Sequence, residues 1–160
     1  MVVSVAGSPH RWPVRVYYED TDAGGIVYYA NYLKFAERAR TEWLRSLGLG
    51  KMLAPTTDGI LFVVRALRVD YLSPARLDDA LEVRTRLCAL GGSRLELEQT
   101  VFRDEVALTV LEVTLVAVGP NGRAMRLSAD VRAACEAVLC PPPSVDSSLV
   151  SSPLSCSLKE

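Results

Sequence analysis

The spacing of hydrophobic residues changes along the chain, and this change separates one helix from a set of strands. In residues 28–47 apolar side chains recur every three or four positions, and charged side chains occupy the opposite face. This spacing predicts an amphipathic helix over residues 28–47, followed by Gly48 at the position that commonly ends a helix. The apolar face consists of Tyr29, Tyr32, Leu33, Ala36, Ala39, Trp43 and Leu47.

From residue 60 onward apolar and polar residues alternate, which is typical of strands with one buried face. The alternation is interrupted by turn-forming residues and predicts strands at residues 60–72, 81–87, 95–101 and 106–118. A first strand is expected at residues 13–18, and a short helix, capped by Asp130, at residues 130–139. The strand at 106–118 is apolar on both faces, so we expect it centrally in the sheet or at a subunit contact.

The order of these elements indicates an α+β domain, because one long helix is followed by four strands joined through short turns. The simplest packing wraps a five-stranded antiparallel sheet around the one long helix. We expect this domain at residues 13–139, after a loose leader at 1–12 and before a flexible, Pro- and Ser-rich tail at 140–160. A chain of 160 residues is long enough to bury a core within one domain.

Composition and charge argue against several classes of protein. The net charge of −1 provides no broad positive field, so general nucleic-acid binding is not expected. No apolar run reaches the length of about 18 residues that a transmembrane helix needs. The first residues also lack the pattern of a secretory signal, and the four cysteines form no Cys-x-x-Cys pair, so a reducing cytoplasmic location is expected.

The cysteines and the single histidine also limit the chemistry. The cysteine spacing does not provide a set of ligands for a metal, so no metal site is expected. The one histidine, His10, falls in the expected leader, where a catalytic side chain would be poorly positioned. Carboxylates and backbone groups are therefore the expected source of any catalysis.

Residues 20–29 combine such groups. Asp20 and Asp22 stand two positions apart, directly before Gly24, Gly25 and the start of the predicted helix. Unpaired N–H groups at a helix N-terminus can polarise a carbonyl and stabilise an oxyanion. A neighbouring carboxylate can act as a nucleophile or activate a water molecule. This combination suits acyl-transfer hydrolysis, although the same residues also fit an ordinary capped turn without a catalytic role.

The sequence RWPVRVYYEDTDAGGIVY at residues 11–28 resembles the opening of the hotdog-fold acyl-CoA thioesterases of the 4-hydroxybenzoyl-CoA thioesterase superfamily. Within that superfamily it is most similar to the Tol-Pal-associated, YbgC-like branch. The likeness continues at residues 37–42, 62–65 and 74–79. It implies a hotdog fold and a homodimer or homotetramer with active sites at the subunit interface. It also implies an acyl-CoA substrate and no cofactor, while the alternative of acyl carrier protein as the carrier stays open.

The resemblance further implies that Asp22 is the catalytic acid and that the backbone N–H of Tyr29 polarises the thioester carbonyl. Many members of the branch have histidine at the position of Tyr29, a departure that bears on acyl-group preference more than on the reaction.

Five other residues are candidates for substrate binding. Gly25 would let the substrate approach the backbone, and Tyr28 would line an acyl pocket. Asn31 would form a hydrogen bond within the active-site loop. Arg65 and Arg76 would contact the phosphates of coenzyme A. Each candidate has a structural alternative, such as core packing for the tyrosine or a surface ion pair for either arginine.

Two other functions remain open on the same fold. Hotdog hydratases and dehydratases usually pair a histidine with an acid, and the position of His10 before the motif argues against them. A non-catalytic module that binds an acyl carrier or an envelope complex would keep the fold without needing Asp22.

Overall fold

The computed structural model describes residues 7–53 and 59–140. In chain order the elements are β1 (His10–Arg15), the 3-10 turn η1 (Tyr18–Asp20), α1 (Asn31–Ser46), the 3-10 turn η2 (Gly50–Leu53), β2 (Leu61–Tyr71), β3 (Ala80–Leu90), β4 (Arg94–Arg103), β5 (Val106–Val118) and α2 (Ala129–Glu136).

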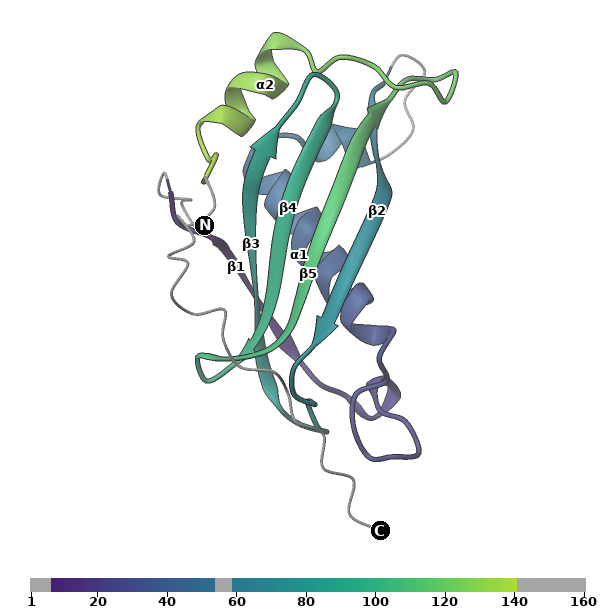
Figure 1. Cartoon of the computed structure of the whole chain (residues 1–160), viewed down its shortest axis with the longest axis vertical. Coiled ribbons are helices and arrows are strands. Elements are labelled where there is room, and N and C mark those ends of the chain that lie inside the picture. The colour runs from purple at the N-terminus through teal and green to yellow at the C-terminus, as the bar shows by residue number, and fades with distance from the viewer. Residues whose placement is uncertain (1–6, 54–58, 141–160) are drawn as a thin grey trace, which may run out of the picture.

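The strands form one antiparallel sheet in the order β1-β3-β4-β5-β2. Helix α1 lies across one face of this sheet, and α2 lies at one end of it (Figure 1). Phe35 and Trp43 of α1 are fully or almost fully buried against inward-facing residues such as Leu87 and Leu97. The α+β class and the five-stranded antiparallel sheet are therefore confirmed.

Helix α1 is shorter than its sequence pattern predicts. It begins at Asn31 and has 16 residues. The three residues before it form a turn, in which the N–H of Asn31 donates to the carbonyl of Tyr28 at 2.8 Å and the N–H of Tyr28 donates to the carbonyl of Asp20 at 2.9 Å. The rings of Tyr28 and Tyr29 pack 4.6 Å apart outside the helix. The expected helix start at residue 28 is therefore wrong. The prediction arose because these two aromatic residues continue the apolar spacing of the helix.

Strand β1 begins earlier than predicted. His10 pairs with Thr85 and is only 6% exposed, so residues 10–12 belong to the sheet and not to a loose leader. The strand ends at Arg15 because the chain then enters η1, where the Asp20 carboxylate accepts the N–H of Tyr17 at 2.8 Å. Residues 1–6 of the expected leader and residues 141–160 of the expected tail lie outside the described residues.

The two strands richest in apolar residues differ in their surroundings. Strand β5 lies between β4 and β2, which agrees with the expected central place. Strand β2 lies at the edge of the sheet, and its Val63, Val64 and Leu67 are 41–50% exposed. The pairing of β2 with β5 shifts register around Arg65, which marks a bulge in this edge strand.

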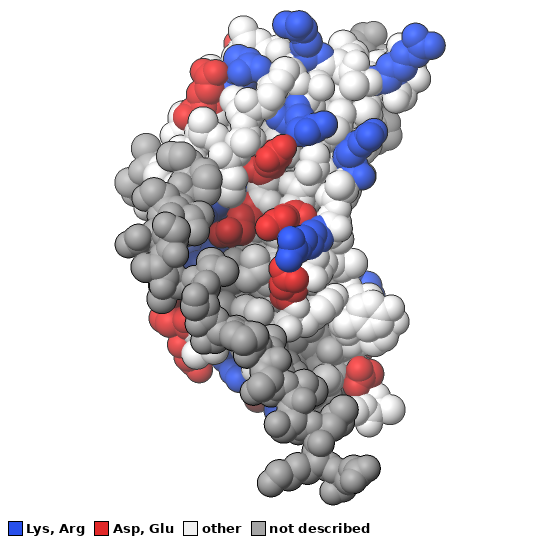
Figure 2. Space-filling model, viewed as in Figure 1, with Lys and Arg blue, Asp and Glu red and all other residues white. Residues whose placement is uncertain are grey.

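Figure 2 shows acidic and basic side chains interspersed over the face of the molecule that is turned away from α1. Arg84 on β3 pairs there with Glu82 and Glu105. This mixture agrees with the near-neutral net charge and presents no broad positive surface on this face. Within the described residues, no helix combines the length and the hydrophobicity needed to cross a membrane.

Candidate functional site

The loop between β1 and α1 is held in place by Asp20 and not by a helix cap. Asp20 is buried, and its carbonyl accepts both the N–H of Tyr28 and the side-chain amide of Asn31 at 2.9 Å. The N-cap of α1 is Ala30, which contributes no side-chain hydrogen bond. Asp20 therefore supports the loop, and Asn31 anchors it from the first position of α1.

Asp22 sits in a tight turn that fixes one of its carboxylate oxygens. Its Oδ1 accepts the N–H of Gly24 at 2.8 Å, while its own N–H donates to the carbonyl of Ile26 at 3.0 Å. Gly25 closes the turn with a φ of +73°, a conformation that glycine adopts without steric cost. A Cβ atom on Gly24 would lie 3.0 Å from Oδ1 of Asp22, so a side chain there would displace the carboxylate. The glycines thus shape the surroundings of the carboxylate.

A pocket of about 450 Å³ opens beside this turn. Asp22 is the one charged residue on its wall, and the rest of the lining is mainly aromatic and aliphatic. The pocket is lined by Asp22, Ile26, Val27, Tyr29, Tyr32, Tyr71, Leu72, Ser73 and Pro74. An apolar cavity with a single carboxylate fits a small organic group next to one reacting centre.

Three tyrosines form the aromatic wall of this pocket. The ring of Tyr71, at the end of β2, lies 6.4 Å from that of Tyr29 and 5.7 Å from that of Tyr32, with edge-on geometry in both pairs. The hydroxyl of Tyr71 donates to the carbonyl of Tyr29 at 2.8 Å. Burial raises the pKa of both Tyr32 and Tyr71, so their hydroxyls stay protonated at neutral pH. Sequence reasoning missed Tyr71 and Ser73, because nothing local in β2 indicates that its end meets the loop at residues 20–30.

The backbone N–H of Tyr29 lies near the expected place but not within α1. Tyr29 is in the turn that precedes the helix, two residues before Asn31. Among the described residues, no backbone or side-chain acceptor takes this N–H. The amide therefore has no acceptor within the described part of the chain, and it lies next to a helix end that has no side-chain cap.

The other predicted residues lie at different distances from this pocket. Tyr28 is 42% exposed and stacks on Tyr29 without lining the cavity, and Gly25 is exposed at the rim. Arg76 is exposed in the loop before β3 and donates its N–H to Asp79. Arg65 is six positions from Tyr71 along β2, a separation of about 20 Å for an extended strand. The structure therefore brings Asp22 and Tyr29 together and leaves Arg65 apart.

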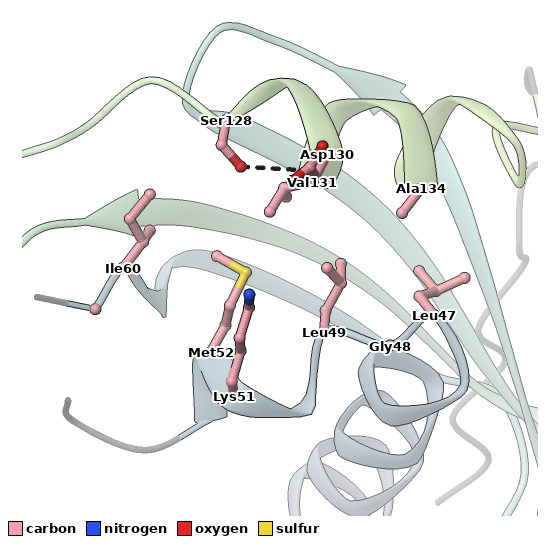
Figure 3. A pocket seen from close by; sticks show the side chains of 11 residues that line it. Leu47, Gly48, Leu49, Lys51, Met52, Ile60, Ser128, Asp130, Val131 and Ala134 are labelled. Atoms are coloured by element: carbon pink, nitrogen blue, oxygen red, sulfur yellow. Dashed lines mark hydrogen bonds between the residues drawn. The ribbon is translucent and has the colours of Figure 1, made fainter.

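A larger cavity of about 720 Å³ lies at the opposite end of α1, between η2 and α2 (Figure 3). Its walls include Leu49, Met52 and Ser128. The hydroxyl of Ser128 accepts the N–H of Val131, so Ser128 caps α2 in place of the expected Asp130. A helix of 16 residues places this cavity about 24 Å from the turn that holds Asp22.

The described residues contain no group of three or more histidine, cysteine or acidic side chains that could hold a metal ion. His10 does not line the pocket beside Asp22. The charge that acts on its ring is that of Glu42, near the other end of α1. The pairing of a histidine with Asp22 is therefore absent from this site.

Residues 24–110 match the family model described as the thioesterase superfamily. The chain is 49% identical over 111 residues to acyl-CoA thioester hydrolase YbgC of Escherichia coli, which covers 69% of this chain and 82% of that protein. It is 45% identical over 107 residues to acyl-CoA thioesterase YbgC of Haemophilus influenzae, covering 67% and 79% of the two chains.

Solved structures agree with these sequence matches. A protein from Bartonella henselae described as a probable thioesterase aligns with a TM-score of 0.70 and 34% identity, over 76% of this chain and all of that one. A hypothetical protein from Thermus thermophilus aligns with a TM-score of 0.75 and 29% identity, over 81% and 98% of the two chains.

Proposed function

The chain belongs to the thioesterase superfamily, and we propose that it hydrolyses acyl-CoA to a free acid and coenzyme A at the pocket beside Asp22. The observation that carries this proposal is that Asp22 and Tyr29 line the same apolar pocket, and that no acceptor among the described residues takes the backbone N–H of Tyr29. The relatives at 49% and 45% identity are named for hydrolysis of acyl-CoA thioesters, which supports the same substrate class here.

Asp22 and Tyr29 have complementary roles in this proposal. The N–H of Tyr29 donates to the thioester oxygen, which makes the carbonyl carbon more electrophilic and stabilises the negative charge that develops on the oxygen. Asp22 either attacks that carbon, forming an anhydride that water then cleaves, or removes a proton from a water molecule that attacks directly. In both routes the carbon–sulfur bond breaks, coenzyme A leaves as a thiol after protonation, and the acyl group leaves as a carboxylate.

The three tyrosines would hold the acyl group. The pocket volume of about 450 Å³ suits a short or aromatic acyl chain better than a long extended one. Arg76 is a candidate for binding the phosphates of coenzyme A outside the pocket. Arg65 lies too far from the pocket of its own chain and is a candidate only in a dimer. Gly25, Tyr28 and Asn31 shape or anchor the loop at its rim.

We also propose that two copies pair through β2. This strand is one of the two edge strands of the sheet, and its exposed apolar residues have no cover from the described part of the chain. Pairing of two β2 edges would join the sheets and bury these side chains. The homotetramer, the Tol-Pal association and acyl carrier protein as carrier remain predictions that rest on the family resemblance. The cytoplasmic location remains a prediction from the cysteines and the first residues of the sequence.

The test compares thiol release from a panel of acyl-CoAs by the wild type and by two variants. Asp22→Asn keeps the side-chain size but removes the carboxylate, and we expect it to lose about 100-fold or more in kcat, as for other positioned acid–base groups. Asp130→Asn removes an acid from the other cavity and should leave turnover unchanged. If a folded wild type binds acyl-CoA without hydrolysing it, the protein is a binding module; if Asp22→Asn retains full turnover, the proposed site is wrong.

A further inference from the structure

Cys88 and Cys140 are distant in the sequence but meet at one edge of β3. Strand β1 pairs with β3 only as far as Thr85, so the edge of β3 beyond that residue is left open by β1. The chain that follows α2 occupies this position. Leu139 forms a parallel bridge with Leu87, and the N–H of Cys140 donates to the carbonyl of Leu87 at 2.9 Å.

This pairing sets the two cysteines side by side. Each cysteine directly follows one member of the Leu87–Leu139 bridge, and the two segments run in the same direction. Backbones paired in this way lie about 4.8 Å apart. A disulfide needs a Cα separation of about 4.4–6.8 Å. Cys88 lies where β3 shifts register against β4, and the single Leu87–Leu139 bridge next to it brings Cys140 close. Both cysteines are free and half-buried, and this neighbourhood is compatible with a bond between them.

The surroundings of the two thiols support their proximity and assign them different roles. Burial raises the pKa of the Cys88 thiol, and the charges of Glu98 and Cys140 add to the increase, so a charge on Cys140 is felt at Cys88. The Cys140 thiol donates to the carbonyl of Gly7 at 3.3 Å. A raised pKa leaves less thiolate on Cys88 at neutral pH, which disfavours Cys88 as the attacking thiol.

We propose that Cys88 and Cys140 form a reversible disulfide under oxidising conditions, which fastens the segment after α2 to β3. The Cys140 thiolate attacks oxidised glutathione, whose S–S bond breaks as one reduced glutathione leaves and a mixed disulfide forms. Cys88 then loses its proton and attacks Sγ of Cys140, which releases the second glutathione. In total, two protein thiols are oxidised to one disulfide, and one glutathione disulfide is reduced to two thiols.

Such a bond would act on stability more than on catalysis. It would close a covalent loop that contains β4, β5 and α2, and closed loops of this kind restrict the unfolded chain. Cys88 lies near the end of β3 that packs by α2, whereas the pocket with Asp22 lies before α1. We therefore expect oxidation to raise the unfolding temperature by several degrees and to leave acyl-CoA turnover unchanged.

The experiment uses the full chain, incubated with mixtures of oxidised and reduced glutathione, then alkylated and analysed by intact mass and peptide mapping. The parallel sample is Cys156→Ser, which leaves Cys88 and Cys140 unaltered and removes a competing thiol of the C-terminal segment. We expect the peptide linking Cys88 to Cys140 to exceed any other linked pair at least tenfold in both samples. Reduction by dithiothreitol should abolish the peptide and the rise in unfolding temperature together.

Cys135 provides an internal comparison, because it is completely buried and its pKa is raised to about 11 by that burial. It should remain reduced throughout. The proposal is overturned by a stable glutathione adduct on Cys140 without the internal bond, or by a dominant link from either cysteine to Cys156. Peptide mapping of the wild type alone decides between these outcomes, so the test needs no substitution of Cys88 or Cys140.

Discussion

Two neighbouring glycines in the Asp22 turn allow the catalytic role of that turn to be separated from its contribution to stability. Gly24 and Gly25 each precede the helix, but substitution by alanine would meet a different obstacle at each position. At Gly24 the new Cβ would lie 3.0 Å from Oδ1 of Asp22, in a backbone conformation that alanine can adopt. At Gly25 nothing lies within 4 Å, but the φ of +73° disfavours any side chain.

The sizes of the two effects follow from these obstacles. In Gly24→Ala, Asp22 must move by several tenths of an ångström, which weakens its 2.8 Å hydrogen bond from the N–H of residue 24. Because a misplacement of about 1 Å can reduce catalysis by about 100-fold, we expect a loss of about tenfold in kcat/KM with little change in stability. In Gly25→Ala, the left-handed conformation costs about 1–2 kcal/mol, or about 2–8 °C in unfolding temperature for a chain of this size.

The assay measures kcat/KM with the best acyl-CoA of the panel and the unfolding temperature of both variants under the same conditions. The expected result is a crossed pattern: Gly24→Ala mainly loses activity, and Gly25→Ala mainly loses stability. A Gly24→Ala variant with wild-type kcat/KM would refute the argument, because it would show that the position of Asp22 Oδ1 does not limit turnover. Equal losses of activity in both variants would show that the turn acts only as a folded unit.

Three further predictions concern other parts of the molecule. Tyr71→Phe removes the 2.8 Å hydrogen bond to the carbonyl of Tyr29, and since such a bond contributes about 0.5–1.5 kcal/mol, kcat/KM should fall by about two- to tenfold in steady-state kinetics. Replacing Val64 and Leu67 together by aspartate should convert the dimer to a monomer in light scattering coupled to gel filtration; an unchanged mass would place the contact elsewhere. Burial lowers the pKa of His10 below its usual 6.5, so the native state resists protonation there. Stability should therefore decline as the pH falls below about 6.5, and His10→Gln should weaken that decline in pH-dependent urea unfolding.

The strands could be predicted from the sequence because one face of each inner strand packs against α1. Leu87 and Leu97 are almost completely buried, and the alternation of apolar residues in β3 and β4 records that burial directly. The start of α1 could not be found in the same way. The rings of Tyr28 and Tyr29 pack against each other in the turn, and Tyr29 also packs against Tyr71. Because both rings count as apolar, their spacing extended a helical pattern into this turn.

Only the part of the candidate site that is contiguous in the chain could be predicted from the sequence. Asp22 and its glycines are neighbours in the chain, and the chemistry of a carboxylate before a helix can be inferred from such a segment. Tyr71 and Ser73 come from the end of β2, and the pairing of β2 with β5 determines that they reach the same pocket. Such long-range placement depends on the register of the whole sheet, and no local spacing encodes it.

Packing within one chain does not explain why β2 carries exposed apolar residues. Val64 and Leu67 together with Leu33 and Glu37 of α1 line a groove of about 460 Å³ that is open to solvent along the sheet edge. If the alternation recorded only packing within this chain, these valine and leucine side chains would be buried, yet they are 50% and 41% exposed. A second copy paired along β2 would cover them and close the groove, whose Leu33 directly follows Tyr32 of the pocket wall. Dimer formation should therefore be required for activity, and a monomeric double variant that keeps its fold but loses turnover would show that the partner completes the site.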